Sequence, residues 1–288
     1  MAKSILHMIE SSMGGFSKGQ KLIGNYILQN YDKAAFMTAS KLGKKVGVSE
    51  STVVRFASEL GYDGYPSMQR ALQEMIRSRL TSTQRIQQAG DLLSGQDVLA
   101  TVMQSDIDKL RMVVDEGDRL EFDKVVNQIM SARHLYILGV RSSSFVAGYL
   151  NFYMHLLFEK VTLVQSNAAG EIFEQLFRIG PGDVMIAVSF PRYSRVTVNT
   201  VKFARDRGAT IVAITDNELS PVYQMADSAL LAPSEMFSFV DSMVAPLSLI
   251  NALLVAVGYR MGTDVSKTFG ELEDIWNEYG VFGKMDDE

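Results

Sequence analysis

Five short, almost uninterrupted apolar runs recur along the second half of the chain, and patterns of helical periodicity lie between most of them. The runs are rich in Val, Ile and Leu and cover residues 135–140, 161–165, 184–190, 210–215 and 229–232. Strands that read as continuous apolar segments are buried on both faces, which is typical of parallel sheets covered by helices. The sequence therefore predicts an α/β/α sandwich over residues 126–265, with a five-stranded parallel sheet in the flavodoxin-type order 2-1-3-4-5.

Hydroxyl-rich loops follow the first and the third of these runs. In the predicted order the two strands are neighbours at the switch point of the sheet, where ligands bind beyond the carboxyl ends of the strands. Each loop also opens a helix, whose free N–H groups favour an anion. Because three consecutive serines exceed what helix capping needs, we expect a small phosphorylated ligand; no G-x-G-x-x-G motif follows the first run, so a dinucleotide is not expected. The predicted ligand-binding residues here are Ser142, Ser143, Ser144, Ser189, Arg192, Tyr193 and Ser194.

The segment TASKLGKKVGVSESTVVRF, residues 38–56, has the spacing of a helix-turn-helix. Gly43 provides the small residue needed where two helices touch, and Gly47 suits a tight turn that requires a positive φ. Ser49 can cap the second helix. The inner face of that helix is formed by the apolar residues Val53, Phe56 and Leu60. We therefore predict an all-α helix-turn-helix domain over residues 1–80, with helices over 17–30, 38–45 and 49–60 and a fourth after Pro66.

The outer face of the second helix carries the side chains that a recognition helix needs. Hydroxyls near its N-terminus can approach phosphates or base edges, and an arginine one turn later can reach a base or a phosphate. Lysines just before the turn lie where the first helix would cross the DNA backbone. The predicted DNA-binding residues are Lys44, Lys45, Ser49, Ser51, Thr52 and Arg55. The alternative is a helical hairpin whose glycines only permit close packing.

The net charge of −5 conceals an asymmetry between the two parts of the chain. Residues 1–85 hold 12 Lys and Arg against 6 Asp and Glu, whereas the remaining residues hold 16 basic against 27 acidic side chains. A basic N-terminal part joined to an acidic body is expected when only one domain meets a polyanion, although chance unevenness is the alternative. The acidic body also argues against an architectural protein around which DNA wraps, because phosphates would repel it.

The composition excludes several classes of site. There is no Cys, so disulfides, Cys-based metal sites and thiol catalysis are excluded. The three His residues, His7, His134 and His155, are scattered, so we expect no metal site, and no cofactor is indicated. Charged residues interrupt the N-terminal segment, and the longest apolar stretch, residues 244–258, is shorter than the roughly 20 residues of a membrane span. We expect no signal peptide, no membrane partner and a cytoplasmic location.

Two further segments flank the predicted sheet domain. Residues 81–125 are polar with helical patterning, and we interpret them as a helical linker. Apolar residues recur there at helical spacing and predict a face that packs on the second domain or on a partner subunit. These residues are Met103, Ile107, Leu110 and Val114. Residues 266–288 are expected to form a C-terminal helix and an acidic tail.

Both predicted domains resemble those of a known family. Residues 1–75 resemble the helix-turn-helix domain of RpiR/MurR regulators through TASKLGKKVGVSESTVVRFASELGYDGY. Residues from about 125 to 260 resemble the sugar isomerase (SIS) domain of these regulators through GVRSSS, SFPRYSR and ITDNELSP. The resemblance implies a transcriptional regulator, not an enzyme, whose binding to double-stranded operator DNA is modulated by a phosphorylated sugar in the SIS domain. It also implies assembly into homodimers or homotetramers.

The second loop departs from the pattern of the SIS domains it resembles, which read Ser-x-Ser-Gly-x-Thr at this place. Ser189 holds the first position, but Pro191 replaces the second Ser, Arg192 the Gly and Ser194 the Thr. This loop therefore cannot make the same hydroxyl contacts. Either Arg192 or Tyr193 contributes instead, or the loop recognises a different ligand.

An aldose–ketose isomerase or a lyase on the same fold is the main alternative. Such chemistry needs a general base near the sugar carbons, usually Glu or His. Glu171, at the start of a helix after the second strand, is the candidate, and it can equally hydrogen-bond a sugar hydroxyl as a ligand-binding residue. His134 precedes the first strand, at the wrong end of the sheet. His155 is expected to be a packed core residue of its helix.

Overall fold

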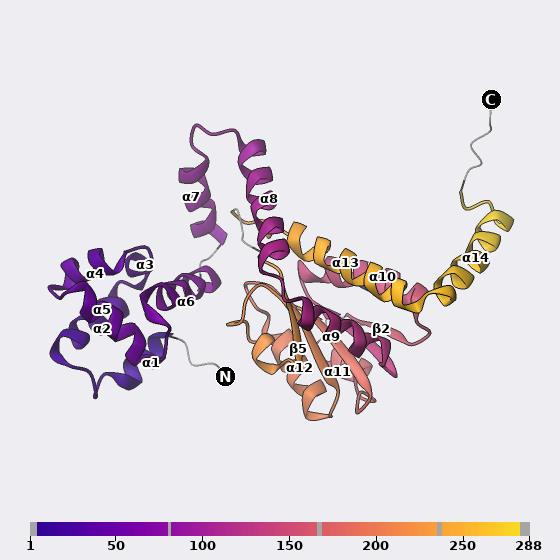
Figure 1. The fold of residues 1–288 in the computed structure, drawn as a ribbon, viewed down its shortest axis with the longest axis horizontal. Helices are drawn as coiled ribbons and strands as arrows, with labels where there is room; N and C mark the ends of the chain where they lie inside the picture. Colours follow the sequence, from indigo (N-terminus) through magenta and orange to yellow (C-terminus); the bar gives the residue numbers. More distant parts are fainter. Residues whose placement is uncertain (1–4, 80–81, 166–168, 235–237, 283–288) are drawn as a thin grey trace. The chain divides into compact units, whose positions relative to one another are not determined.

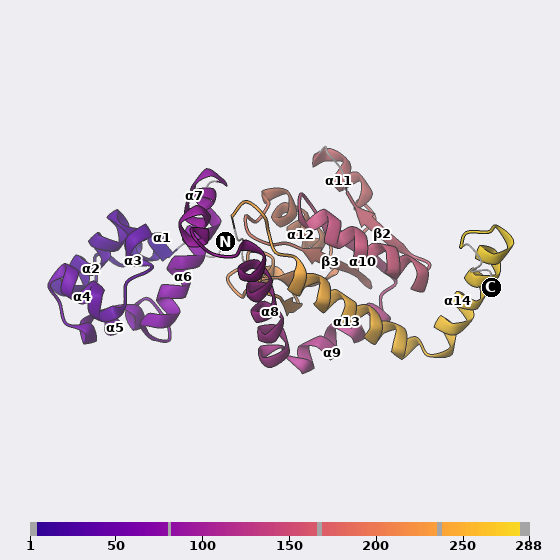
Figure 2. The same ribbon diagram turned by 90° about the horizontal axis from the view of Figure 1, so that it is seen from above.

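The computed structural model describes residues 5–79, 82–165, 169–234 and 238–282. Its contacts divide the chain into two compact units, residues 1–89 and 90–288, which Figures 1 and 2 show from two directions. The segment predicted as a linker contains α7 (Ser82–Leu93), α8 (Val98–Glu116) and the first half of α9 (Arg119–Met130). Of these, α8 and α9 belong to the second unit.

The first unit is helical, and its described helices are α1 (Ile5–Ser12), α2 (Lys18–Gln29), α3 (Tyr31–Ala34), α4 (Ala39–Val46), α5 (Glu50–Glu59) and α6 (Gly64–Arg79). The periodicity predicted α2, α4, α5 and α6, but it missed α1 and α3, which are short. Ile23, Ile27 and Phe56 are fully buried in the core of this unit. Leu22 of α2 is exposed, because its neighbour Ile23 takes the inward position.

The second unit contains a parallel sheet of five strands in the order β2-β1-β3-β4-β5, as predicted. The strands are β1 (His134–Gly139), β2 (Val161–Val164), β3 (Asp183–Val188), β4 (Thr210–Thr215) and β5 (Ser228–Leu231). All four pairings between neighbouring strands are parallel. The order places β1 and β3 side by side at the switch point, where their carboxyl ends face the same edge.

Helices cover both faces of the sheet, which explains why its strands read as continuous apolar runs. On one face, α9, α10 (Ser143–Leu157) and α13 (Val244–Met261) pack against alternate side chains such as Leu135 and Ile137. On the other face, α11 (Ala169–Gln175) and α12 (Arg195–Asp206) pack against Tyr136 and Leu138. The remaining described helices of this unit are η1 (Tyr223–Met225) and α14 (Thr263–Glu278).

The burial of single residues bears on two expectations about helices of the second unit. α13 is long and apolar enough to cross a membrane by length and composition, but a single helix of this kind is weak evidence. Ile250, Leu253 and Val257 of α13 are fully buried against the sheet, whereas Val255 and Tyr259 are exposed. His155, expected to be buried in α10, is exposed instead, because Met154 takes the inward position.

An ion pair between the buried carboxylate of Asp183 and the exposed Arg133, at the amino end of β3, supports our first prediction. The Asp183 carboxylate accepts hydrogen bonds from Arg133 Nε at 2.9 Å, from Arg133 Nη2 at 2.8 Å and from the Gly180 amide at 2.9 Å. Burial raises the pKa of Asp183, but the hydrogen bonds from Arg133 and Gly180 lower the pKa by more than burial raises it. The pKa of Asp183 therefore lies below its ordinary value. The charged form is therefore the one that stabilises the fold.

Asp183→Asn is expected to lower the free energy of unfolding by about 2 kcal/mol at pH 7, since a buried, hydrogen-bonded charge is lost. Because the pKa in the folded state is depressed, the contribution of Asp183 is present above its unfolded pKa of about 3.9 and is lost as the pH falls through the folded value. Urea unfolding of both proteins at pH 7 and pH 3 measures this. The difference should shrink at pH 3; an equal difference at both pH values would contradict the role of the charge.

Candidate functional site

The carboxyl ends of β1 and β3 bring the two serine loops together. The strands are in register up to the pair Gly139 and Val188, the last residue of each strand. The loop after β1 therefore leaves the sheet next to the loop that begins at Ser189. Both loops lead into helices of more than two turns, α10 and α12, so two helix N-termini open towards the same edge.

Gly139 holds the first loop tightly against its helix. A Cβ atom at this position would lie 2.5 Å from the Ser143 carbonyl oxygen and 2.6 Å from the Ala147 Cβ, so only glycine fits. The chain then turns through Arg141, whose φ of 58° lies in the left-handed region. The first turn of α10 is thereby held against the end of β1.

The three consecutive serines have three different environments. Ser142 is exposed, and its hydroxyl donates a hydrogen bond to Asp241 Oδ2 at 2.7 Å. The Ser144 hydroxyl donates to the Arg141 carbonyl oxygen at 2.6 Å. Ser143 is only 6% exposed, and its hydroxyl has no hydrogen-bond partner within the described part of the chain. A nearly buried hydroxyl without a protein partner is a natural ligand contact.

The serines of the second loop also differ in their environments. Ser189 is 3% exposed; its carbonyl oxygen accepts a hydrogen bond from Thr215 Oγ1 at 2.6 Å, while its hydroxyl has no partner among the described residues. Ser194 caps α12, and its Oγ accepts from the Val196 amide at 3.2 Å. The Ser143 and Ser189 hydroxyls are thus the two on these loops that are both nearly buried and without a described partner.

The other predicted ligand residues lie around this edge. The Tyr193 hydroxyl donates to Asp216 Oδ1 at 2.9 Å, which ties the second loop to the end of β4. Arg192 is exposed, and its guanidinium has no ion-pair or hydrogen-bond partner in the described ranges. Glu171 is exposed in the first turn of α11. The structure therefore brings the serine loops and Tyr193 to one edge, and Glu171 is exposed at the start of the helix that follows β2.

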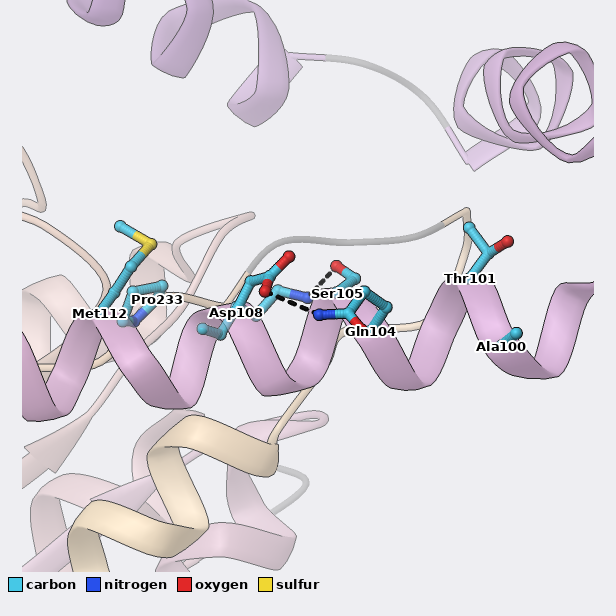
Figure 3. A pocket seen from close by; sticks show the side chains of 8 residues that line it. Ala100, Thr101, Gln104, Ser105, Asp108, Met112 and Pro233 are labelled. Atoms are coloured by element: carbon cyan, nitrogen blue, oxygen red, sulfur yellow. Dashed lines mark hydrogen bonds between the residues drawn. The ribbon is translucent and has the colours of Figure 1, made fainter.

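A groove of about 700 Å³ runs along α8 beside Pro233, which follows β5 (Figure 3). Lys109 lies at its base, 4% exposed, and its Nζ contacts Ser105 Oγ at 2.8 Å and Asp106 Oδ1 at 3.3 Å. The Ser242 hydroxyl donates to the same Asp106 oxygen at 2.6 Å. Helix α8 thus faces the rest of its unit with polar side chains. Its apolar residues Met103, Ile107 and Val114 are exposed in the single chain.

The helix-turn-helix of the first unit is formed by α4 and α5. A Cβ atom on Gly43 would lie 2.8 Å from the Val48 carbonyl oxygen, and Gly47 has a φ of 77°, so both glycines meet the predicted requirements. Ser49 is the N-cap of α5 and accepts from the Thr52 amide at 3.3 Å. The angle between the two helices is therefore set by backbone contacts that no larger side chain allows.

The outward face of α5 presents the predicted DNA-binding side chains. Ser51 and Arg55 are exposed, and Arg55 Nε donates to the Ser51 carbonyl oxygen at 3.3 Å. The Ser49 hydroxyl lies 2.9 Å from Ser51 Oγ and 2.8 Å from Thr52 Oγ1. The remaining predicted residues, Lys44 and Lys45, are exposed in the last turn of α4. A groove of about 800 Å³ separates this face from the start of α2 and is lined by Ser17, Gly19, Gln20, Val48, Ser49, Thr52, Arg55, Ser58 and Glu59.

Both parts of the chain match known domain families. Residues 3–79 match the helix-turn-helix domain of the rpiR family, and residues 128–256 match the SIS domain. The chain therefore joins a helix-turn-helix domain of the rpiR family to a SIS domain. A relative of this regulator in Haemophilus influenzae, named an uncharacterised HTH-type transcriptional regulator, is 29% identical over 241 residues, which cover 80% of this chain and 81% of the relative.

Two solved structures resemble the regulator. NanR of Vibrio vulnificus, complexed with ManNAc-6P, is 23% identical and superposes with a TM-score of 0.60, covering 97% of this chain and 99% of NanR. At this identity the likeness shows the fold. The sugar isomerase domain of an RpiR transcription factor from Sphaerobacter thermophilus is 27% identical with a TM-score of 0.58, covering 62% of this chain and 99% of that domain.

Sequence reasoning missed the polar residues that surround the serine loops of the regulator. Asp241 lies 99 positions after its partner Ser142, and Thr215 lies 26 positions after Ser189. The only local signal was position: Thr215 ends β4 and Asp216 directly follows it, at the same carboxyl edge as the two serine loops. Nothing in the spacing around Asp241 indicated a site.

Proposed function

We propose that this regulator binds operator DNA through α5 and that a phosphorylated sugar, bound where β1 and β3 end, modulates that binding. The observation that carries the proposal is a pair of nearly buried serines, Ser143 and Ser189, whose hydroxyls have no partner in the described part of the chain. These two hydroxyls belong to neighbouring loops that lead into helix N-termini, where free N–H groups stabilise an anion. The ManNAc-6P bound to NanR supports a sugar phosphate as the class of ligand.

The DNA-binding half of the proposal rests on the geometry of the first unit. Hydroxyls gather at the start of α5, with Arg55 one turn further along and two exposed lysines at the end of α4. This is the arrangement in which a recognition helix reads a major groove while the preceding helix contacts phosphates. The basic excess of residues 1–85 supports the same interface.

A sensor fits the site better than an isomerase. Glu171, the candidate base, is exposed on a solvent-facing turn. His134 lies at the amino end of β1, where its Nε2 is 2.8 Å from Thr162 Oγ1, and His155 is exposed on α10. Isomerisation needs a base within hydrogen-bond reach of the sugar carbons. We therefore propose that the sugar phosphate is an effector and is released unchanged by this cytoplasmic regulator.

The exposed apolar residues of α8 support the predicted homodimer or homotetramer. Leu99, Met103, Ile107 and Val114 lie on one side of this helix and are 72%, 55%, 41% and 64% exposed. Contiguous exposed apolar side chains are typical of an interface. We propose that this stripe contacts a second copy of the chain, which is one of the two alternatives that the sequence left open.

A thermal-shift screen tests the effector site. Glucose, fructose, mannose, glucosamine and N-acetylmannosamine 6-phosphates are added to the full chain, and at least one is expected to raise Tm by binding the native state. The double variant Ser143→Ala, Ser189→Ala is expected to lose most of this shift, because each hydroxyl contributes a charge-assisted hydrogen bond of roughly 1.5–3 kcal/mol. Ser131→Ala with Ser11→Ala is the matched control. A full shift in the double variant would contradict the placement of the site.

A further inference from the structure

The carboxylate of Asp241 stands at the edge of the proposed effector site and is held there by the protein. Its Oδ2 accepts the hydrogen bond from Ser142 Oγ at 2.7 Å, one residue before the unpartnered Ser143. Its other oxygen, Oδ1, is buried and has no hydrogen-bond partner among the described residues. A buried carboxylate oxygen without a donor is costly, so its retention calls for a donor that arrives from outside the chain.

The backbone around Asp241 is anchored by other elements of the same unit. The Ser242 hydroxyl donates to Asp106 Oδ1 on α8 at 2.6 Å, and Lys109 stands beside that carboxylate. The Ser242 carbonyl oxygen accepts from Ser234 Oγ at 3.0 Å. Three elements, α8, α10 and the segment after β5, therefore fix the position of Asp241. A polar group fixed in this way is preorganised to recognise a ligand.

The charge of Asp241 decides which part of a ligand it can meet. A carboxylate and a phosphate repel each other, whereas an ionised carboxylate accepts strong hydrogen bonds from O–H and N–H donors. Ser142 is already engaged by Asp241, which leaves Ser143 and Ser189 for the phosphate. We propose that Asp241, positioned by Ser142, is the specificity-determining residue that accepts a hydrogen bond from a hydroxyl or amino group of the sugar. This inference rests on the proposed function.

This assignment gives each of the three serines of the first loop a different role. Ser143 faces the phosphate, Ser142 orients the carboxylate that reads the sugar, and Ser144 fixes the turn through the Arg141 carbonyl. The effector is then a molecule with a phosphate at one end and a hydrogen-bond donor at the other. A simple phosphate ester without a hydroxyl or amino group occupies only half of the site.

Isothermal titration of the full chain with two probes tests this. The probes are the hexose 6-phosphate that gives the largest thermal shift and methyl phosphate, which has no hydroxyl. Asp241→Asn keeps an oxygen that can accept from Ser142 but removes the charge and one acceptor. It is expected to weaken hexose 6-phosphate binding about tenfold, the loss of one charge-assisted hydrogen bond, and to leave methyl phosphate binding within about twofold.

Two further variants separate the role of Asp241 from a general effect of removing a negative charge. Asp206→Asn removes the same charge from an exposed position of α12 and should leave both affinities unchanged. Ser142→Ala should weaken hexose 6-phosphate binding in the same direction as Asp241→Asn, because the carboxylate loses its positioning contact. Hexose 6-phosphate binding that is unchanged or tighter in Asp241→Asn would overturn the role of Asp241 while leaving the proposed function intact. If no hexose 6-phosphate binds the parent protein, the proposed function fails, and this inference fails with it.

Discussion

Arg55→Ala should weaken binding of operator DNA by about tenfold to hundredfold while leaving Tm within a degree or two of the parent protein. Arg55 is exposed on the outward face of α5, and among the described residues its Nε donates only to a backbone carbonyl oxygen of its own helix, so removing it disturbs no core contact. A base contact of this kind is worth roughly 1–3 kcal/mol, which gives the expected loss in affinity. Fluorescence anisotropy with duplex DNA selected by the full chain from a random pool measures it.

The control is Arg70→Ala, which removes the same charge from an exposed position on α6 of the same unit. It should lower affinity far less, because only the long-range attraction of one positive charge for the phosphates is lost. Repeating the titrations at two salt concentrations separates base contacts from phosphate contacts. Equal effects of the two variants at matched salt would show that α5 is not the recognition helix.

Gly139→Ala should destabilise the second unit by about 3 kcal/mol. The new Cβ would lie 2.5 Å from the Ser143 carbonyl oxygen and 2.6 Å from the Ala147 Cβ, so the end of β1 or the start of α10 has to move. Overpacking of a closely packed site costs typically 1–3 kcal/mol, and here one of the atoms is backbone. Urea unfolding followed by circular dichroism and by fluorescence of Trp276, the single Trp of the chain, measures the loss.

A matched glycine lies in the same segment of the second unit. Gly148 is in the middle of α10, and a Cβ there would meet nothing within 4 Å. Gly148→Ala should therefore stabilise the unit by up to about 1 kcal/mol through helix propensity. A methyl group added at either of these two glycines, which are nine residues apart, is thus expected to change the free energy of unfolding in opposite directions. Destabilisation by both variants would mean that α10 tolerates no change, and the explanation by close approach at Gly139 would be wrong.

The strands of the sheet could be predicted because burial on both faces leaves a direct mark on the sequence, and their order was taken from the doubly wound fold that such strands form. Leu135 and Ile137 face one layer of helices while Tyr136 and Leu138 face the other, so the run reads as continuous and apolar. The helix-turn-helix could be predicted for a related reason. Gly43 and Gly47 are required by local backbone geometry, and local requirements appear at fixed spacing.

The roles of individual serines could not be predicted, because they depend on contacts between distant segments. Ser142, Ser143 and Ser144 are chemically identical and adjacent, and the structure distinguishes them only through Asp241, burial and the Arg141 carbonyl. The polar face of α8 was missed for the same reason. Its inward Lys109 is compensated by Asp106 on the same helix and, through it, by Ser242 far along the chain.

The proposed function requires that binding of a sugar phosphate to the SIS domain changes the affinity of the helix-turn-helix domain for DNA. The direct test is titration of the selected duplex with the full chain, with and without a saturating concentration of the hexose 6-phosphate that gives the largest thermal shift. The sugar phosphate is expected to change the Kd for DNA by at least about fivefold, the lower range of allosteric coupling, and the double variant Ser143→Ala, Ser189→Ala is expected to abolish the change. A DNA affinity that no sugar phosphate alters, although one binds the protein, would contradict it.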